Sequence, residues 1–171
     1  MLYEPSDDSF LLQKQVRKYA KGRVLDIGTG TGILAKTALE KTKQVTAVDI
    51  NSESLKNCKN LGIKFIKSDL FSKIKGKFDL IIFNPPYLPD DNIKLEDNIN
   101  YIGGKKGNEI IKKFFSKVNK HLNKKGKILI LFSSLTPNIN EIINRYKFKY
   151  KKLSQKKFFF ETLYTYLVYK R

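Results

Sequence analysis

The chain has 171 residues, 41% of them hydrophobic and 29% charged, and these values predict one globular domain over residues 1–171. The net charge of +18 would suit a polyanionic partner such as RNA, but we favour a lysine-rich solvated surface as its explanation. No hydrophobic run approaches the ~20 residues that cross a bilayer, and the acidic start does not resemble an export signal. We therefore exclude a membrane-spanning protein and expect a cytoplasmic one.

The first half of the chain alternates between segments with helical spacing of apolar residues and short apolar segments. Ser6 is a candidate N-cap for the first helix, and a glycine-rich loop separates the first strand from the second helix. Because strands alternate with helices, we expect a mainly parallel, doubly wound sheet. The predicted helices are Asp7–Ala20, a segment after Gly32 that ends near Lys41, and Ser52–Asn60, and the predicted strands are Arg23–Ile27, Gln44–Asp49, Ile63–Lys67 and Phe78–Phe83.

The second half begins with a long loop and ends without alternation. The loop Asn84–Lys106 holds Pro85, Pro86 and Pro89, and a loop of this length inside a compact domain is usually functional. Two strand-like segments at the end have no helix between them, so they predict an antiparallel hairpin at one sheet edge. The predicted elements are helices at Asn108–Leu122 and Pro137–Tyr146, and strands at Lys127–Phe132, Tyr146–Lys151 and Phe158–Tyr169.

Glycines stand at alternate positions directly after the first strand, at Gly28, Gly30 and Gly32. In a βαβ unit, such a turn lets a ligand approach the backbone at the carboxyl end of the strand. The spacing differs from the GxGxxG of dinucleotide-binding proteins, and Asp26 precedes the first glycine. These features favour an adenosine with an amino-acid tail, because the Asp26 carboxylate can face the ammonium group of that tail.

Acidic residues also follow the next two strands. Asp49 closes the second strand, where a carboxylate can accept hydrogen bonds from both ribose hydroxyls. Asp69 follows the third strand, where it can accept a hydrogen bond from an adenine amino group. One acid at a strand end is often only a helix N-cap, but acids at the ends of three successive strands predict a nucleoside site.

The most specific motif is Asn84-Pro85-Pro86-Tyr87, directly after a predicted strand. It resembles the NPPY signature of class I S-adenosylmethionine methyltransferases that modify a planar NH2 group, either an amide or a base amine. The lone pair of such a nitrogen is delocalised, so the group must be held in line with the methyl. The side-chain oxygen of Asn84 and the carbonyl of Pro85 can each accept one N–H bond, and Tyr87 can cover the planar group.

Segments near both ends of the chain resemble one particular family of these methyltransferases. Residues 3–12, YEPSDDSFLL, resemble the YEPxEDTF opening of the short archaeal and eukaryotic branch of the HemK family, the protein-glutamine methyltransferases of class I release factors. Gly103–Gly107, GGKKG, resembles the GGxxG element of that family, and Phe160–Leu163 is more loosely similar to its closing strand. These motifs span nearly the whole chain.

The resemblance implies an α/β fold of the Rossmann-like class I methyltransferase type, with a seven-stranded, mostly parallel sheet and a C-terminal antiparallel hairpin. It also implies S-adenosylmethionine as cofactor and methyl transfer to N5 of the glutamine in the GGQ motif of a release factor. The catalytic residues would be Asn84, Pro85 and Tyr87. The cofactor-binding residues predicted by the motifs and the resemblance are Ser9, Asp26, Gly28, Gly30, Gly32, Asp49, Asp69, Leu70 and Asn84.

Two other functions stay open from the sequence. An adenine-N6 methyltransferase on DNA or RNA would use the same NPPY motif and suit the positive charge, but the catalytic fold leaves no residues for base recognition. A non-catalytic RNA-binding module would suit the basic tract Arg145–Lys157, although its alternation of aromatics and lysines favours a half-buried strand. With Cys58 and His121 as its single cysteine and histidine, the chain cannot build a Cys/His zinc site, and we predict no metal.

A protein partner is predicted at one edge of the sheet. In a methyltransferase sheet, Ile63–Lys67 forms an edge strand whose apolar side chains and unpaired backbone invite strand addition. The branch that the chain resembles includes members that pair with a small zinc-binding activator protein, so the resemblance implies a heterodimer. Lys64 and Lys67 are the counter-evidence, because charges at an edge also prevent pairing.

Overall fold

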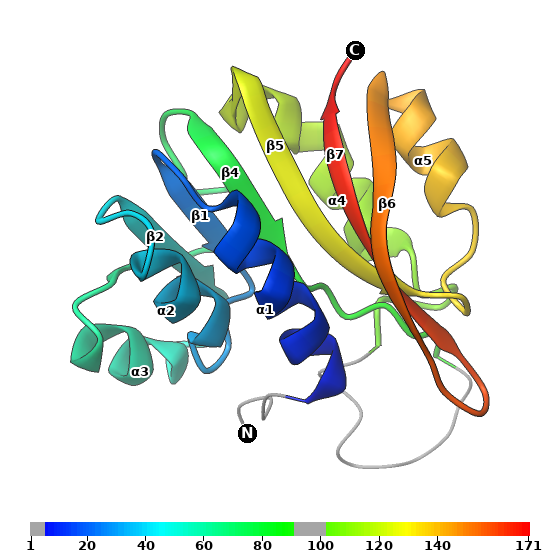
Figure 1. The fold of residues 1–171 in the computed structure, drawn as a ribbon, viewed down its shortest axis with the longest axis horizontal. Helices are drawn as coiled ribbons and strands as arrows, with labels where there is room; N and C mark the ends of the chain where they lie inside the picture. Colours follow the sequence, from blue (N-terminus) through cyan, green and yellow to red (C-terminus); the bar gives the residue numbers. More distant parts are fainter. Residues whose placement is uncertain (1–5, 91–101) are drawn as a thin grey trace.

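The computed structural model describes residues 6–90 and 102–171, and these form a twisted sheet with helices on both faces (Figure 1). The sheet has seven strands in the order β3-β2-β1-β4-β5-β7-β6. Neighbouring strands from β3 to β5 are parallel, and β7 runs antiparallel between β5 and β6. Residues 3–5 of the opening motif and residues 91–101 of the predicted long loop lie outside the described residues.

The strands and helices agree in order with the sequence prediction. The strands are β1 Val24–Ile27, β2 Val45–Asp49, β3 Lys64–Lys67, β4 Phe78–Phe83, β5 Leu122–Ser133, β6 Phe148–Lys157 and β7 Thr162–Lys170. The helices are α1 Asp7–Tyr19, α2 Ile33–Leu39, α3 Ser54–Asn60, α4 Glu109–Val118 and α5 Ile139–Arg145, and a short 3-10 helix, η2, spans Asn119–His121. The predicted fold class, including the C-terminal hairpin, is confirmed.

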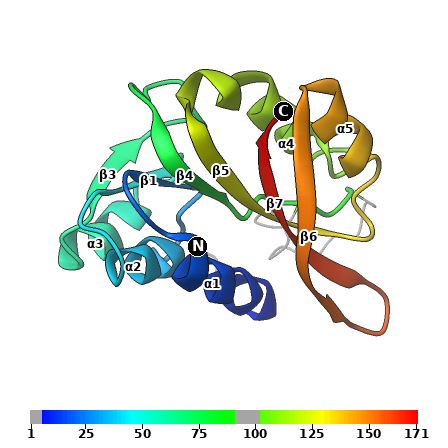
Figure 2. The same ribbon diagram turned by 45° about the horizontal axis from the view of Figure 1, so that its top comes forward.

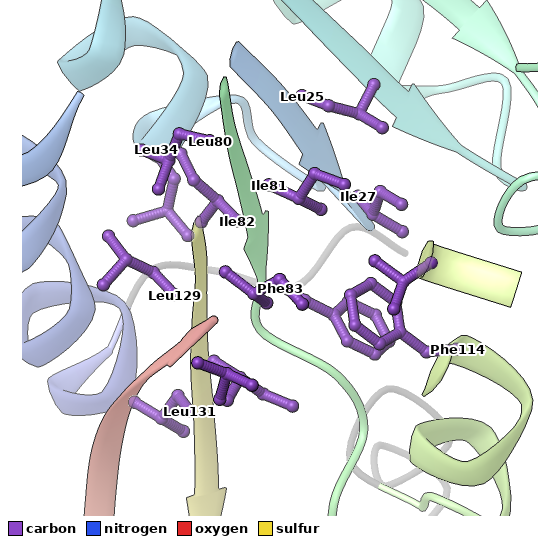
Figure 3. Packing of buried hydrophobic residues seen from close by; sticks show 14 of the residues in the cluster. Leu25, Ile27, Leu34, Leu80, Ile81, Ile82, Phe83, Phe114, Leu129 and Leu131 are labelled. Carbon is purple, nitrogen blue, oxygen red and sulfur yellow. The ribbon is translucent and has the colours of Figure 1, made fainter. Parts of the chain in front are cut away.

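The helices form a layer on each face of the sheet. Figure 2 shows α1, α2 and α3 along one face and α4 and α5 along the other. The central strands are therefore covered on both sides, which explains why β4 is a nearly continuous apolar run. Side chains of this strand alternate, with Leu80 and Ile82 on the side of α1 and α2, and Ile81 and Phe83 on the side of α4 (Figure 3). Phe83 stacks on Phe114 of α4, with ring centroids 4.3 Å apart.

Strand β5 begins earlier than the sequence indicates. The predicted helix Asn108–Leu122 ends as the 3-10 turn η2, and Leu122, expected in that helix, is the first residue of β5 opposite Phe78. The register between β4 and β5 shifts after this pair. Gly126 permits the close approach, because an added Cβ there would lie 2.9 Å from the carbonyl oxygen of Phe78.

The hairpin also differs from its prediction. The predicted strand Tyr146–Lys151 begins at Phe148, because Tyr146 is the C-cap of α5 and Lys147 has a left-handed φ of 63°. It continues to Lys157 because β6 pairs with β7 along its whole length. Strand β7 begins at Thr162, since residues 158–161 form the connection between the two strands. Among the residues described, no helix is long and apolar enough to cross a membrane.

Candidate active site

A cavity of about 320 Å³ opens where β1, β2, β3 and β4 end, and its volume is within the range of small-molecule sites. The carboxyl ends of parallel strands meet at one edge of a sheet, so loops that are distant in sequence come together there. Most of the residues predicted from motifs line this cavity. They are Ser9, Gly28, Gly30, Asp49, Asp69, Leu70, Asn84, Pro85 and Tyr87.

The glycine loop after β1 is held by the acid that ends β2. Asp49 Oδ2 accepts a hydrogen bond of 2.8 Å from the backbone N–H of Gly30, and its Oδ1 accepts one of 2.9 Å from Asn51. Gly30 has a left-handed φ of 52°, and a Cβ there would meet no atom within 4 Å. This glycine therefore serves the backbone conformation and leaves the space above it open to a ligand.

Gly32 lies outside the cavity lining and has a structural role at the start of α2. It is the N-cap of α2, with a left-handed φ of 83°. An added Cβ would contact Leu61 and the sulfur of Cys58, at 3.6 and 3.7 Å. Its part in cofactor binding stays a prediction, and its visible contribution is to turn the chain into α2.

Asp26 lies beneath the loop, 1% exposed and also outside the cavity lining. Its Oδ2 accepts hydrogen bonds from the Thr29 hydroxyl, at 2.7 Å, and from the N–H of Ala35, at 3.1 Å. Its Oδ1 is buried and has no hydrogen-bond partner among the described residues. Burial raises the pKa of Asp26 to about 7, more than its hydrogen bonds lower it. The direct contact of Asp26 with an ammonium group stays a prediction.

The turn after β3 brings Asp69 and Leu70 to the cavity. Asp69 forms an ion pair with Lys113 of α4, so its carboxylate is already held in place on one side. Leu70 has a left-handed φ of 46°, which is uncommon for a branched residue and marks a functional or strained position. The Ser68 hydroxyl donates to the carbonyl of Leu70 at 3.1 Å and stabilises this turn.

Asn84 follows β4 and is oriented by a residue of α1. Its Nδ2 donates a hydrogen bond of 3.2 Å to Oδ2 of Asp8, and its Oδ1 is buried without a hydrogen-bond partner among the described residues. A carboxylate can only accept hydrogen bonds, so Asp8 fixes the amide nitrogen of Asn84 on its own side. The amide oxygen is thereby kept available as an acceptor at the cavity.

The NPPY turn is supported from behind by the GGKKG segment. A Cβ at Gly103 would lie 2.5 Å from the carbonyl oxygen of Pro86, and one at Gly107 would lie 2.7 Å from that of Tyr87. Only glycine fits so close to backbone, which explains the spacing of this motif. The Thr136 hydroxyl donates to the Tyr87 carbonyl at 2.8 Å and holds the turn from the end of β5.

Asp8 and Ile50 are among the cavity residues that the sequence analysis did not predict. Asp8 lies in the first turn of α1, is 3% exposed and lines the cavity beside Asn84. Its position within the YEPSDDSF motif was the sequence feature that could have indicated a role at the site. Ile50 is 67% exposed although it is apolar, and it lines the cavity directly after Asp49. An exposed apolar residue next to Asp49, the acid predicted to bind a ribose, offers a surface to a base.

Comparison with known proteins agrees with this geometry. Residues 6–160 match the family described as Methyltransferase small domain. A Methanocaldococcus jannaschii protein assigned as a protein N5-glutamine methyltransferase is 42% identical over 156 residues, which cover 85% of this chain and 79% of that protein. The chain belongs to the HemK family of protein-glutamine methyltransferases. The predicted family, enzyme class and S-adenosylmethionine cofactor are confirmed for this HemK-family enzyme.

Other relatives of the HemK-family enzyme extend the comparison. The release factor glutamine methyltransferase of Deinococcus radiodurans is 41% identical over 88 residues, 46% of this chain and 31% of that protein. The chain thus spans about a third of this bacterial relative's length. In structure, the E. cuniculi Mtq2–Trm112 complex, responsible for methylation of the translation termination factor eRF1, has a TM-score of 0.80 at 26% identity and covers 99% of both chains.

Proposed function

We propose that this HemK-family enzyme methylates N5 of the glutamine in the GGQ motif of a translation release factor, in the cytoplasm, with residues 1–171 as one catalytic domain. The observation that carries the proposal is the buried Oδ1 of Asn84, an acceptor without a partner among the described residues at the cavity. A primary amide presents two N–H donors, one for this oxygen and one for the carbonyl of Pro85.

The residues of the cavity fit S-adenosylmethionine. The buried, unpartnered Oδ1 of Asp26 beneath the loop suits a cationic group above it. Asp49 suits the ribose, and Asp69 with Leu70 suits the adenine. Held by these residues, S-adenosylmethionine would supply the methyl group of its sulfonium, leaving as the thioether S-adenosylhomocysteine, and the amide nitrogen that gains the methyl group would lose one proton.

The role of the chain's own residues is to position and polarise the amide. Asn84 and Pro85 hold the NH2 group in one orientation, which replaces a diffusive encounter with a fixed approach. The acceptors also stabilise positive charge as it develops on the nitrogen. Pro85 and Pro86 have no N–H, so the turn presents no competing backbone donor at these positions.

The test is methyl transfer from labelled cofactor to a release factor, to a short GGQ peptide and to an adenine-containing oligonucleotide. We expect label in the first two and none in the third. A GGE peptide is the matched control, because glutamate lacks the NH2 group. Label in the oligonucleotide alone would replace the proposal by the adenine-N6 alternative.

A partner protein at the β3 edge belongs to the same proposal. Strand β3 pairs only with β2, as predicted, and leaves its other side unpaired among the described residues. Phe65 and Ile66 are half-buried and Lys64 and Lys67 are exposed. The structural relative is a complex with a second protein, Trm112. We propose that a small zinc-binding protein adds to this edge and covers the apolar centre of β3.

The edge proposal is tested by co-purification of the enzyme with a co-expressed candidate partner. Phe65→Asp should abolish the complex, because it places a charge in the apolar centre of the edge. Tyr150→Asp is the control, since Tyr150 is a half-buried aromatic residue on the opposite edge strand β6. A wild-type chain that stays monomeric and fully active on a release factor without added protein would show that Lys64 and Lys67 protect the edge from pairing.

A further inference from the structure

The connection between β6 and β7 carries an unusual apolar feature, the aromatic tip, formed by Phe158, Phe159 and Phe160. Phe159 and Phe160 are 93% and 84% exposed. Their rings pack edge to face, with centroids 4.7 Å apart and an interplanar angle of 83°. Burial of large aromatic side chains is energetically favourable, so exposed aromatic side chains that cluster together often mark an interaction surface.

The aromatic tip is anchored at its base. The N–H of Phe158 donates to the Glu161 carbonyl at 2.8 Å, and the Glu161 side chain accepts a hydrogen bond from the Ser133 hydroxyl. Thr162 and Ser134 are joined by two further hydrogen bonds, of 2.8 and 3.0 Å. A surface that is ordered before binding loses little conformational entropy when a partner docks.

The aromatic tip lies at the end of the molecule where the cavity opens. Figure 1 shows the hairpin turn and the start of α1 at the end toward which β4 and β5 point. Lys156 beside the tip pairs with Asp7 at 2.7 Å, next to the cavity residue Asp8. Two further apolar residues are exposed on the segments bonded to the hairpin: Phe10, in the helix whose Asp7 pairs with Lys156, at 47%, and Leu135, next to Ser134, at 46%.

The reaction needs recognition outside the cavity. Asn84 and Pro85 can recognise only the NH2 group of an amide, and every glutamine and asparagine side chain carries that group. A cavity of about 320 Å³ has the size of a small-molecule site and cannot take in the body of a protein, so selection of one protein substrate requires contacts outside the cavity. Phe159 and Phe160 of the aromatic tip are the two most exposed large apolar side chains among the described residues.

We propose that the aromatic tip is a docking surface for the body of the protein substrate, at a site away from its GGQ tripeptide. This inference rests on the proposed function. The partner surface is apolar with an acidic border, because exposed lysines line the adjacent strand β6 at Lys151, Lys152 and Lys157. Protein is favoured over RNA because perpendicular rings offer no parallel platform for successive bases, and Lys156 is already paired with Asp7.

The test is the double variant Phe159→Ser/Phe160→Ser, measured with a full-length release factor and with a short GGQ peptide. We expect KM for the release factor to rise at least tenfold, about 1.4 kcal/mol, with kcat unchanged and with peptide kinetics unchanged. Leu55→Ser on α3 is the control, an apolar residue 44% exposed, and should match wild type. Equal binding of S-adenosylhomocysteine by all variants confirms intact cofactor sites.

Several results would overturn the inference. These are an unchanged KM for the release factor, an equal loss on the peptide, loss of RNA retention as the only effect, and loss of a dimer of this chain as the only effect. If wild type methylates neither peptide nor release factor, the proposed function fails instead. Direct binding of the release factor then decides the docking question, since the double variant should bind it at least tenfold more weakly than wild type.

Discussion

The two halves of the cavity differ in how their polar groups are satisfied. In the cofactor half, where β1 and β2 end, Asp49 accepts hydrogen bonds from Gly30 and Asn51. In the transfer half, after β4, the Oδ1 of Asn84 is buried with no partner among the described residues. An unsatisfied buried acceptor costs about 1–3 kcal/mol. Within the part of the chain that the structure describes, Asp49 is thus partnered before a ligand arrives, whereas Asn84 keeps a free acceptor at the cavity and Asp26 keeps one beneath the glycine loop.

This difference between the two halves predicts that changes in one affect cofactor binding and changes in the other affect methyl transfer. In the proposed function, the cofactor half binds S-adenosylmethionine at the ends of consecutive strands, so a side-chain change there should alter cofactor affinity first. The transfer half takes Asp8 from α1, the NPPY turn from β4 and Gly103 and Gly107 from before α4. Its side chains contact the reacting amide in the proposed function, so changes there should alter turnover first.

The largest effect is expected for Asn84→Ala. Loss of one positioned hydrogen-bonding group at a reacting centre typically costs about 2.7–4 kcal/mol, so kcat on a GGQ peptide should fall by roughly 10²–10³. Binding of S-adenosylhomocysteine, measured by calorimetry, should stay within about threefold of wild type. Near-normal turnover would remove Asn84 from the catalytic role.

Asn108 provides the matched control for that variant. Like Asn84, it has a buried Oδ1 without a hydrogen-bond partner among the described residues, and its Nδ2 donates to the Pro137 carbonyl at 2.9 Å. It does not line the cavity. Asn108→Ala should lower the melting temperature but keep kcat within a few-fold of wild type. An equal collapse of kcat in both variants would mean that the Asn84 effect is structural.

A smaller effect is expected for Asp8→Asn. A neutral amide at position 8 no longer forces the Nδ2 of Asn84 to its side, and it replaces a charged hydrogen bond with a weaker neutral one. We expect kcat to fall about tenfold while cofactor affinity stays unchanged. Asp7→Asn is the adjacent control, because the Asp7 side chain is 50% exposed. Equal kcat in the two variants would separate Asp8 from the orientation of Asn84.

Strands β4 and β5 differ in how well the sequence predicts their ends. Strand β4 matched its prediction at both ends because Phe78–Phe83 is buried on both faces and carries a clear apolar signal. Strand β5 did not, because its first residues, Leu122–Gly126, are mostly polar and are set by pairing with Phe78. That pairing joins segments that are distant in the chain, so the sequence around Leu122 carries no local pattern that would predict a strand.

The candidate site shows the same limit. Gly28 and Asn84 directly follow strands and Asp49 is the last residue of one, so their positions along the chain bring them to the cavity. Asp8 was missed because its contact with Asn84 spans a separation of 76 residues. Asp26 was expected at the cavity, but the hydrogen bonds to Thr29 and Ala35 hold its side chain beneath the loop. A motif gives residue types, and tertiary contacts decide which way each side chain points.

In the cofactor half, Asp49→Ala should weaken the binding of S-adenosylmethionine at least about tenfold. Hydrogen bonds to a charged acceptor contribute about 1.5–3 kcal/mol, and the ribose loses that acceptor while Gly30 loses its anchor. Turnover at saturating cofactor should fall much less than in Asn84→Ala. Calorimetry that gives wild-type affinity would contradict the ribose assignment.

The smallest expected effect concerns the pH dependence at Asp26. Burial raises the pKa of Asp26 to about 7, so the folded protein holds a proton there that the unfolded chain releases near pH 4, and stability falls as pH rises from about 4 to 7. A cationic ligand above the loop favours the ionised carboxylate, so cofactor affinity should rise a few-fold between about pH 6 and 8. In Asp26→Asn this rise should disappear. Titrations of both proteins in buffers of different ionisation enthalpy would detect the released proton, and an identical pH profile for the two would show that Asp26 only supports the loop.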